Sequence, residues 1–121
     1  MFKLVILIEP PSDMLKFEER WPEFLDQAEK MPGLKKETFS PVYAKIHGES
    51  QVAMIHELYF ESPDALREAM ASEAGQAAGA VLQEITDGHV TLLFADHLED
   101  EIANIQALKL PQKDDLPGDK A

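Results

Sequence analysis

The spacing of apolar residues along the chain predicts four strands. Residues 2–8 are apolar at almost every position, which is typical of a strand that is buried on both faces. Residues 34–46 are more polar. Pro41 in their middle cannot donate a ladder hydrogen bond, so we expect an edge strand that is bulged or bent there. A hairpin turn is predicted at 48–51. It leads into a third strand at 52–60, and a fourth strand is predicted at 89–95.

Apolar residues at helical spacing predict a first helix after the first strand. Ser12 or Asp13 caps its start, and Met31-Pro32-Gly33 ends it because glycine readily takes a positive φ. Pro22 removes a backbone hydrogen bond inside this pattern, so we expect the helix to be kinked or split in two. The apolar stripe consists of Phe17, Trp21, Phe24, Leu25 and Ala28.

A second helical stretch follows the third strand. Ser62 is a favourable N-cap, and Pro63 takes the first helical position, where a missing N–H group does no harm. We expect a break near Ser72 and an end at Asp87-Gly88. The residues predicted to face inward are Leu66, Ala69, Met70, Ala74, Ala78, Val81, Leu82 and Ile85.

The element order β-α-β-β-α-β indicates a ferredoxin-like α+β sandwich. Right-handed crossovers place the first and third strands in the centre and the second at an edge, with both helices on one face. The other face is then too apolar to lie in water, so we expect a homodimer through this sheet face, a dimeric α+β barrel with a cavity or core between the sheets. That face consists of Val5, Leu7, Ile55, Glu57, Tyr59, Thr91 and Leu93.

The C-terminal part of the chain extends beyond this domain, which spans residues 1–97. Asp96 and Glu99 have the spacing of a capping box, so we expect an extra C-terminal helix over residues 98–108. Residues 109–121 have the composition of a flexible acidic tail.

Composition narrows the class of protein. The chain has 121 residues, a net charge of −12 and no cysteine. The acidic balance argues against binding to nucleic acid or to an anionic membrane surface, and no segment is long enough to span a bilayer. The absence of cysteine excludes disulfides and thiolate chemistry and fits a cytoplasmic protein.

Three polar residues of the third strand are the candidate catalytic groups. Glu57 and Tyr59 share the inter-sheet face, where an apolar cavity would raise the pKa of a carboxyl group and a tyrosine would orient a carbonyl or phenol. Alternatively, Glu57 forms a structural ion pair with a lysine of the partner subunit, such as Lys3 or Lys35. His56 has an ordinary pKa near neutrality, but its parity places it on the helix side, where a packed histidine is the alternative.

Apolar residues from both sides of the sheet are the candidate substrate-binding groups. Trp21 and Phe24 lie beside the predicted kink, where they would line a pocket mouth or else belong to the core. No histidine and carboxylate spacing indicates a metal centre, and no phosphate or dinucleotide loop is present, so we expect neither a metal nor a cofactor. The candidates on the inter-sheet face are Val5, Leu7, Ile55, Thr91 and Leu93.

Three short motifs carry a family resemblance. They are Met-Pro-Gly-Leu at 31–34, Glu-Leu-Tyr-Phe-Glu-Ser at 57–62 and Ser-Glu-Ala-Gly-Gln-Ala-Ala at 72–78. In order and spacing they resemble the EthD family, named for ethyl tert-butyl ether degradation, which belongs to the dimeric α+β barrel superfamily. The resemblance covers roughly residues 1–97 and implies the same fold and dimer. It also implies an association with ether degradation, and superfamily relatives include polyketide cyclases, lactone isomerases and small monooxygenases that bind substrate inside each barrel.

Two positions depart from the family pattern. The family often shows a histidine, with a proline two residues later, shortly before the Pro-Gly turn, where this chain has Phe24 and Asp26. Val81 stands where an acidic residue is common after the alanine-rich stretch. The resemblance therefore does not carry these polar groups over to this chain.

The leading hypothesis is a dimeric barrel that binds a small, mainly apolar organic molecule between sheet and helices. It would act as a cofactor-free catabolic enzyme of isomerase, cyclase or monooxygenase type, with Glu57 and Tyr59, ahead of His56, as polar contacts. The alternative is a non-catalytic dimer with a filled barrel that serves assembly or partner binding. A haem or oxygen-linked monooxygenase ranks last because the cavity face offers no ligand histidine.

Overall fold

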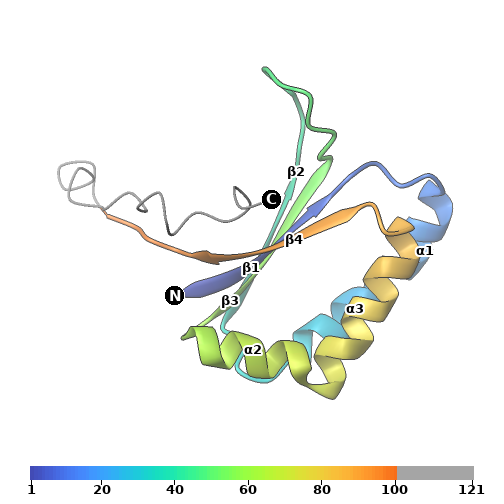
Figure 1. The fold of residues 1–121 in the computed structure, drawn as a ribbon. Coiled ribbons are helices and arrows are strands. Elements are labelled where there is room, and N and C mark those ends of the chain that lie inside the picture. Colours follow the sequence, from blue (N-terminus) through green and yellow to red (C-terminus); the bar gives the residue numbers. More distant parts are fainter. Residues whose placement is uncertain (101–121) are drawn as a thin grey trace, which may run out of the picture.

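The computed structural model describes residues 1–100 and contains a four-stranded antiparallel sheet with its helices on one face (Figure 1). The strand order is β2-β3-β1-β4, so β1 and β3 are central and β2 is an edge strand, as predicted for a ferredoxin-like fold. The elements in chain order are β1 (Phe2–Ile8), α1 (Met14–Glu29), β2 (Lys36–Pro41), β3 (Met54–Phe60), α2 (Pro63–Ala71), α3 (Glu73–Thr86) and β4 (Val90–Asp96).

The register of the central strands decides which residues face the helices. Ile6 lies opposite His56, and Val5 lies opposite Glu57. Because successive strand residues point to opposite faces, the even-numbered residues of β1 and β3 face the helices and the odd-numbered ones face away. The helix side forms the core, whose strand members are Leu4, Ile6, Ile8, Leu58 and Phe60.

Helix α1 begins at a capped turn and passes through its proline without a break. The side chain of Asp13 accepts a hydrogen bond from the backbone N–H of Lys16 at 3.0 Å. Pro22 lies inside a helix that continues from Met14 to Glu29, so the expected split does not occur. Both Glu18 and Pro22 are exposed, so water can solvate the carbonyl of Glu18 that proline leaves without an intrahelical donor.

Ser72 separates the second and third helices, where a break was predicted. Its hydroxyl donates to the carbonyl of Ala69 at 2.6 Å and accepts from the backbone N–H of Gly75 at 3.0 Å. One side chain therefore ends α2 and caps α3. The predicted start of α2 is also confirmed, since the Ser62 hydroxyl accepts from the N–H of Ala65 at 3.1 Å.

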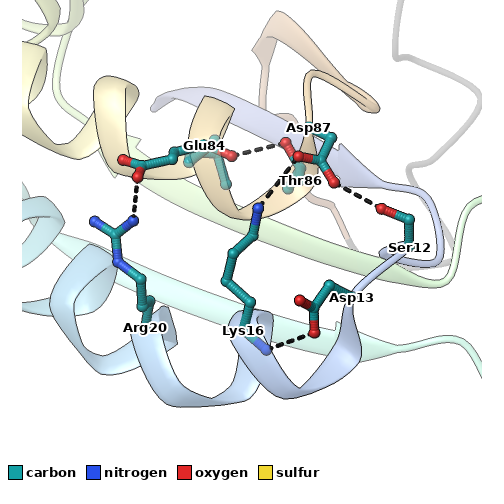
Figure 2. Close-up of polar contacts among 8 residues, drawn as sticks. Ser12, Asp13, Lys16, Arg20, Glu84, Thr86 and Asp87 are labelled. Carbon is teal, nitrogen blue, oxygen red and sulfur yellow. Dashed lines mark hydrogen bonds and ion pairs between the residues drawn. The ribbon is translucent and has the colours of Figure 1, made fainter.

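Polar contacts tie the start of α1 to the end of α3 (Figure 2). Asp87, which follows α3 with a φ of 51°, accepts hydrogen bonds from the hydroxyl of Ser12 at 2.6 Å and the ammonium of Lys16 at 3.2 Å. Arg20 lies 2.7 Å from Glu84 one helical turn further along. The Ser12 and Lys16 hydrogen bonds lower the pKa of Asp87. These contacts fix the two helices side by side over the sheet.

The second strand is shorter than predicted. It ends at Pro41 rather than bending through it to residue 46, because proline cannot donate to the ladder. One further backbone pair follows, in which Val42 N–H donates to the carbonyl of Ala53 at 2.8 Å. Residues 42–53, here called the arm, then connect β2 to β3 and extend beyond the sheet (Figure 1).

The last strand is partly exposed on its helix side and extends one residue further than predicted, to Asp96. Leu92 and Phe94 point to the helix side but are 40% and 61% exposed, because the helices do not extend over this part of β4. Asp96 is the last residue of β4 rather than a helix cap, and residues 97–100 have no regular structure. The remainder of the predicted helix over 98–108 and the predicted tail over 109–121 lie outside the described residues.

Candidate functional site

The candidate polar residues of β3 lie on opposite faces of the sheet. His56 faces the helices, whereas Glu57 and Tyr59 face away from them. The structure therefore brings Glu57 and Tyr59 together and separates both from His56. Trp21 and Phe24 lie on the His56 side. The sheet face away from the helices, here called the open face, carries the other predicted binding residues, Val5, Leu7, Ile55, Thr91 and Leu93.

The imidazole of His56 is packed among aromatic rings. The residue is 1% exposed. Its ring centroid lies 5.5 Å from that of Trp21, 5.7 Å from that of Phe24 and 5.9 Å from that of Phe39. Helix α1 contributes two of these rings, and β2 contributes the third. The histidine is therefore enclosed by aromatic side chains from two successive elements, α1 and β2.

One nitrogen of this imidazole is paired and the other is not. Nε2 lies 3.1 Å from Oε2 of Glu37 on the neighbouring strand. A carboxylate only accepts hydrogen bonds, so the neutral imidazole donates from Nε2 and carries its lone pair on Nδ1. Nδ1 is buried and is the one buried side-chain polar atom within residues 1–100 that lacks a hydrogen-bond partner.

Burial keeps His56 uncharged at neutral pH. Removal from water lowers the pKa of its imidazole from 6.5 to about 4, although the carboxylates of Glu29 and Glu57 act in the opposite direction. Glu37, the hydrogen-bond partner of His56, also forms a hydrogen bond with the carboxyl group of Glu29 and raises its pKa. His56 is therefore a neutral hydrogen-bonding group at pH 7.

The pocket beside His56 measures about 210 Å³, which is smaller than the roughly 300 Å³ or more of drug-sized sites. An engineered apolar cavity of about 150 Å³ is known to bind benzene, so this volume suits one substituted ring. The walls combine apolar surface with few polar groups, as is usual for small-molecule sites. This histidine pocket is lined by Trp21, Leu25, Glu37, Thr38, Phe39 and His56. Phe24 does not line it and belongs to the core.

The polar groups of the open face form an ion pair within one chain. Nζ of Lys3 lies 2.5 Å from Oε2 of Glu57, so the lysine comes from the same subunit rather than from a partner. The hydroxyl of Thr38 donates to Oε1 of Glu57 at 3.2 Å. Burial alone would raise the pKa of Glu57, but the hydrogen bonds and charge of its neighbours lower it. Glu57 is therefore ionised, and both its oxygens accept hydrogen bonds.

Tyr59 packs beside this ion pair. Its hydroxyl lies 3.5 Å from Oε1 of Glu57. The ammonium groups of Lys3 and Lys36 lie 5.3 Å and 4.8 Å from the centre of its ring, within the range of cation–π attraction. The ring of His97 meets it edge-on at 5.0 Å. The roles predicted for Glu57 and Tyr59 in catalysis stay predictions.

Sequence reasoning missed Glu37 and Phe39 as neighbours of His56. Their position follows from the β2–β3 register, in which Phe39 lies opposite His56. The alternation along residues 36–41 indicated that Glu37 and Phe39 share one face. Without the strand register, however, the sequence does not show which residues of β3 lie opposite them. Within the described residues, no group of three His, Cys, Asp or Glu side chains is placed to hold a metal ion. No helix in that part of the chain has the length and apolar content to cross a membrane.

Comparison with known proteins gives relatives along most of the chain. No family model matches the sequence. The uncharacterised 11.0 kDa protein in the thcB-thcC intergenic region of Rhodococcus erythropolis is 27% identical over 97 residues, which are 79% of this chain and 94% of that protein. An EthD family protein from Bacillus halodurans has a TM-score of 0.73 at 26% identity, covering 81% of this chain and 99% of that one.

Two more distant structures share the fold. A dimeric ferredoxin-like protein from Jannaschia sp. has a TM-score of 0.62 at 16% identity over 79% of this chain and 98% of its own. A variant of SnoaB, a cofactor-independent oxygenase from Streptomyces nogalater, has a TM-score of 0.61 at 12% identity over 82% and 94%. The chain thus has a ferredoxin-like α+β fold, and the comparisons confirm its resemblance to the EthD family.

Proposed function

We propose that the protein is a homodimer that binds a small, largely apolar ring compound in the histidine pocket. The observation that carries this proposal is the buried, neutral His56, whose Nδ1 lacks a hydrogen-bond partner beside a pocket of about 210 Å³. A buried polar atom without a partner is unfavourable by about 1–3 kcal/mol. A hydroxyl group on the ligand would supply the missing hydrogen bond, and the aromatic walls would hold its ring.

Access to Nδ1 requires one side chain of the pocket wall to move. Phe39 is 45% exposed and lies 5.9 Å from the imidazole, ring centre to ring centre. Its position on an edge strand leaves it room to turn outward. We infer that Phe39 is the side chain that opens when the ligand enters.

Binding is the first candidate function and a cofactor-free reaction is the second. Glu37 orients the imidazole as a carboxylate orients a catalytic histidine, and the structural neighbour SnoaB is a cofactor-independent oxygenase. A general base works best when its pKa lies near the working pH, however, and the pKa of His56 is about 4. The low basicity favours a role as hydrogen-bond acceptor over proton abstraction.

The homodimer part of the proposal rests on the open face. No described helix covers this face (Figure 1), and Leu93, on its edge strand β4, is 45% exposed. The structural neighbour from Jannaschia sp. is dimeric. An isologous contact between two open faces would remove their apolar side chains from water. Leu93→Asp should convert the dimer to a monomer in sedimentation experiments, whereas Leu15→Asp, on the outer side of α1 and 66% exposed in wild type, should not.

The ligand site can be tested with the protein's own fluorescence, because Trp21 is its one tryptophan and lines the pocket. Titration with 4-methylphenol and with toluene compares the same ring with and without a hydroxyl donor. We expect saturable changes with both and about a 3- to 10-fold preference for 4-methylphenol, the effect of one neutral hydrogen bond.

Two histidine variants show which side chain gives the preference for 4-methylphenol over toluene. His56→Leu should abolish it while leaving toluene binding in place, and His89→Ala, at an exposed histidine, should preserve it. If neither compound changes the fluorescence in a saturable way at millimolar concentration, the binding proposal fails and the non-catalytic, filled dimer takes its place.

A further inference from the structure

The arm between β2 and β3 carries large apolar side chains that its own chain does not cover. Tyr43 is 100% exposed and Ile46 is 99% exposed, more than any other large apolar residue among the described positions. The arm is attached to the sheet at its base, where Val42 N–H donates to Ala53 at 2.8 Å and Ala53 N–H donates to Ile8 at 2.7 Å. Its tip turns at Gly48, which has a φ of 106°. The arm is thus anchored at one end and projects past the sheet (Figure 1).

A groove joins the arm to the open face of the sheet. Its volume is about 450 Å³. Leu7 of β1 and Ile55 of β3 form its floor, and both belong to the open face. The arm residues that line it are Val42, Ala44, Lys45, Ile46, His47, Ser50 and Val52. The groove is therefore continuous with the open face, and its lining combines apolar side chains with Lys45, His47 and Ser50.

The β2–β3 register explains how the arm joins the open face. Thr38 of β2 lies opposite Glu57 and shares the open face with it. Counting on by two, as the alternation of a strand requires, places Ser40 and Val42 on the same side, up to the last backbone pair of the ladder. Beyond Val42 the backbone is no longer a strand, and residues of both parities, such as Lys45 and Ile46, line the groove.

We propose that the arm is part of the homodimer contact and that Tyr43 and Ile46 pack against the partner subunit. This inference rests on the proposed dimer through the open face. A second copy is the occupant that fits, because the groove is continuous with that face and an isologous contact brings each arm to the other subunit by symmetry. Each arm would then hold the edge of the opposite sheet.

Sedimentation equilibrium of the full chain tests the proposal through the dimer dissociation constant. Replacement of both residues, Tyr43→Asp with Ile46→Asp, should raise that constant about tenfold or more, because buried apolar anchors dominate interface energetics. Met14→Asp with Leu15→Asp, which places the same two charges on the exposed start of α1, should leave it unchanged. An unchanged constant in the arm variant would overturn the proposal.

A second measurement does not depend on charged substitutions. The chain has no cysteine, so Tyr43→Cys provides one attachment point for an environment-sensitive dye. On dilution from dimer to monomer its emission should shift to the red, whereas a dye at Leu15→Cys should show no shift. Absence of the shift at position 43 would also overturn the proposal.

The controls separate this inference from the dimer itself. If Leu93→Asp dissociates the dimer while the arm variants do not, the open-face dimer stands and the role of the arm is refuted. If wild type sediments as a monomer throughout the micromolar range, both proposals are refuted.

Discussion

Nε2 of His56 lies 3.1 Å from Oε2 of Glu37, while Nδ1 of the same ring has no hydrogen-bond partner. The two residues are on neighbouring strands and are brought together by the β2–β3 register. This relationship fixes which imidazole nitrogen carries the proton and leaves the other as an acceptor in an apolar surrounding.

Stability should depend on pH through His56. Its pKa is about 4 in the folded protein and 6.5 in its ordinary state, so between these values the unfolded chain binds more protons than the native one. The contribution of neutral His56 to the free energy of unfolding is therefore fully present above pH 6.5 and is lost as the pH falls toward 4. The total loss is about 3 kcal/mol at most. The charges of Glu29 and Glu57 act in the opposite direction and favour the protonated imidazole, and the carboxyl group of Glu37 is its hydrogen-bond partner.

Urea unfolding at pH 7 and at pH 5 measures this effect when wild type and His56→Leu are compared at one protein concentration. The variant should lose most of the difference between the two pH values, and the exposed-site control His89→Ala should retain it. An equal pH dependence in wild type and His56→Leu would show that the carboxyl groups, and not the histidine, are responsible.

The ion pair of the open face should behave as a coupled unit. Lys3→Met leaves the carboxylate of Glu57 partly buried without its main partner, and we expect a loss of about 1–3 kcal/mol in the free energy of unfolding. Adding Glu57→Leu should restore most of that loss, because no unpaired charge remains. Denaturant unfolding of both single variants and the double variant gives the coupling energy, and additive effects would contradict the pairing.

Two glycines of α3 should respond in opposite ways to alanine. A Cβ at Gly75 would lie 2.1 Å from the carbonyl oxygen of Ala69, so Gly75→Ala must displace backbone at the α2–α3 junction and should destabilise by about 1–3 kcal/mol or more. A Cβ at Gly79 meets nothing within 4 Å. Gly79→Ala should therefore stabilise by about 0.5–1 kcal/mol through helix propensity. Thermal unfolding of the two variants measures the change in melting temperature of each. Equal shifts in the two variants would refute the geometric explanation.

The serine between α2 and α3 should be replaceable only by another capping residue. Ser72→Ala removes the acceptor for Gly75 N–H and should lower the free energy of unfolding by about 1 kcal/mol. Ser72→Asn, which retains a side-chain acceptor, should stay close to wild type. A matching loss in both variants would indicate that the hydroxyl donation to Ala69 at 2.6 Å matters more than the cap.

Much of the fold could be predicted because local rules agreed with one another. The period of two along β3 placed His56 on the helix side and Glu57 and Tyr59 on the other, and the structure confirms it. Ser62 and Ser72 marked helix starts because their hydroxyls cap free N–H groups. The end of β2 was predicted less well, since a strand pattern does not show where a ladder stops once proline has removed a donor.

The site was less predictable because it depends on contacts across strands and between distant segments. The sequence offered Lys3 as a partner of Glu57 only across subunits, whereas the antiparallel pairing of β1 and β3 brings the two side chains together within one chain. Glu37 and Phe39 lie 19 and 17 positions before His56, beyond an irregular arm whose length hides the register. Parity alone therefore identifies a face of the sheet but not the neighbours on it.

Nitrogen NMR of the His56 imidazole gives the most direct test of the proposed ligand contact, because it observes Nδ1, the atom that would accept a hydrogen bond from the ligand hydroxyl. At pH 7 the account predicts an Nδ1 resonance typical of an unprotonated imidazole nitrogen, which moves toward the protonated range when 4-methylphenol is added and stays in place with toluene. An Nδ1 resonance that ignores 4-methylphenol at saturating concentration, or one already protonated in the free protein, would contradict the account.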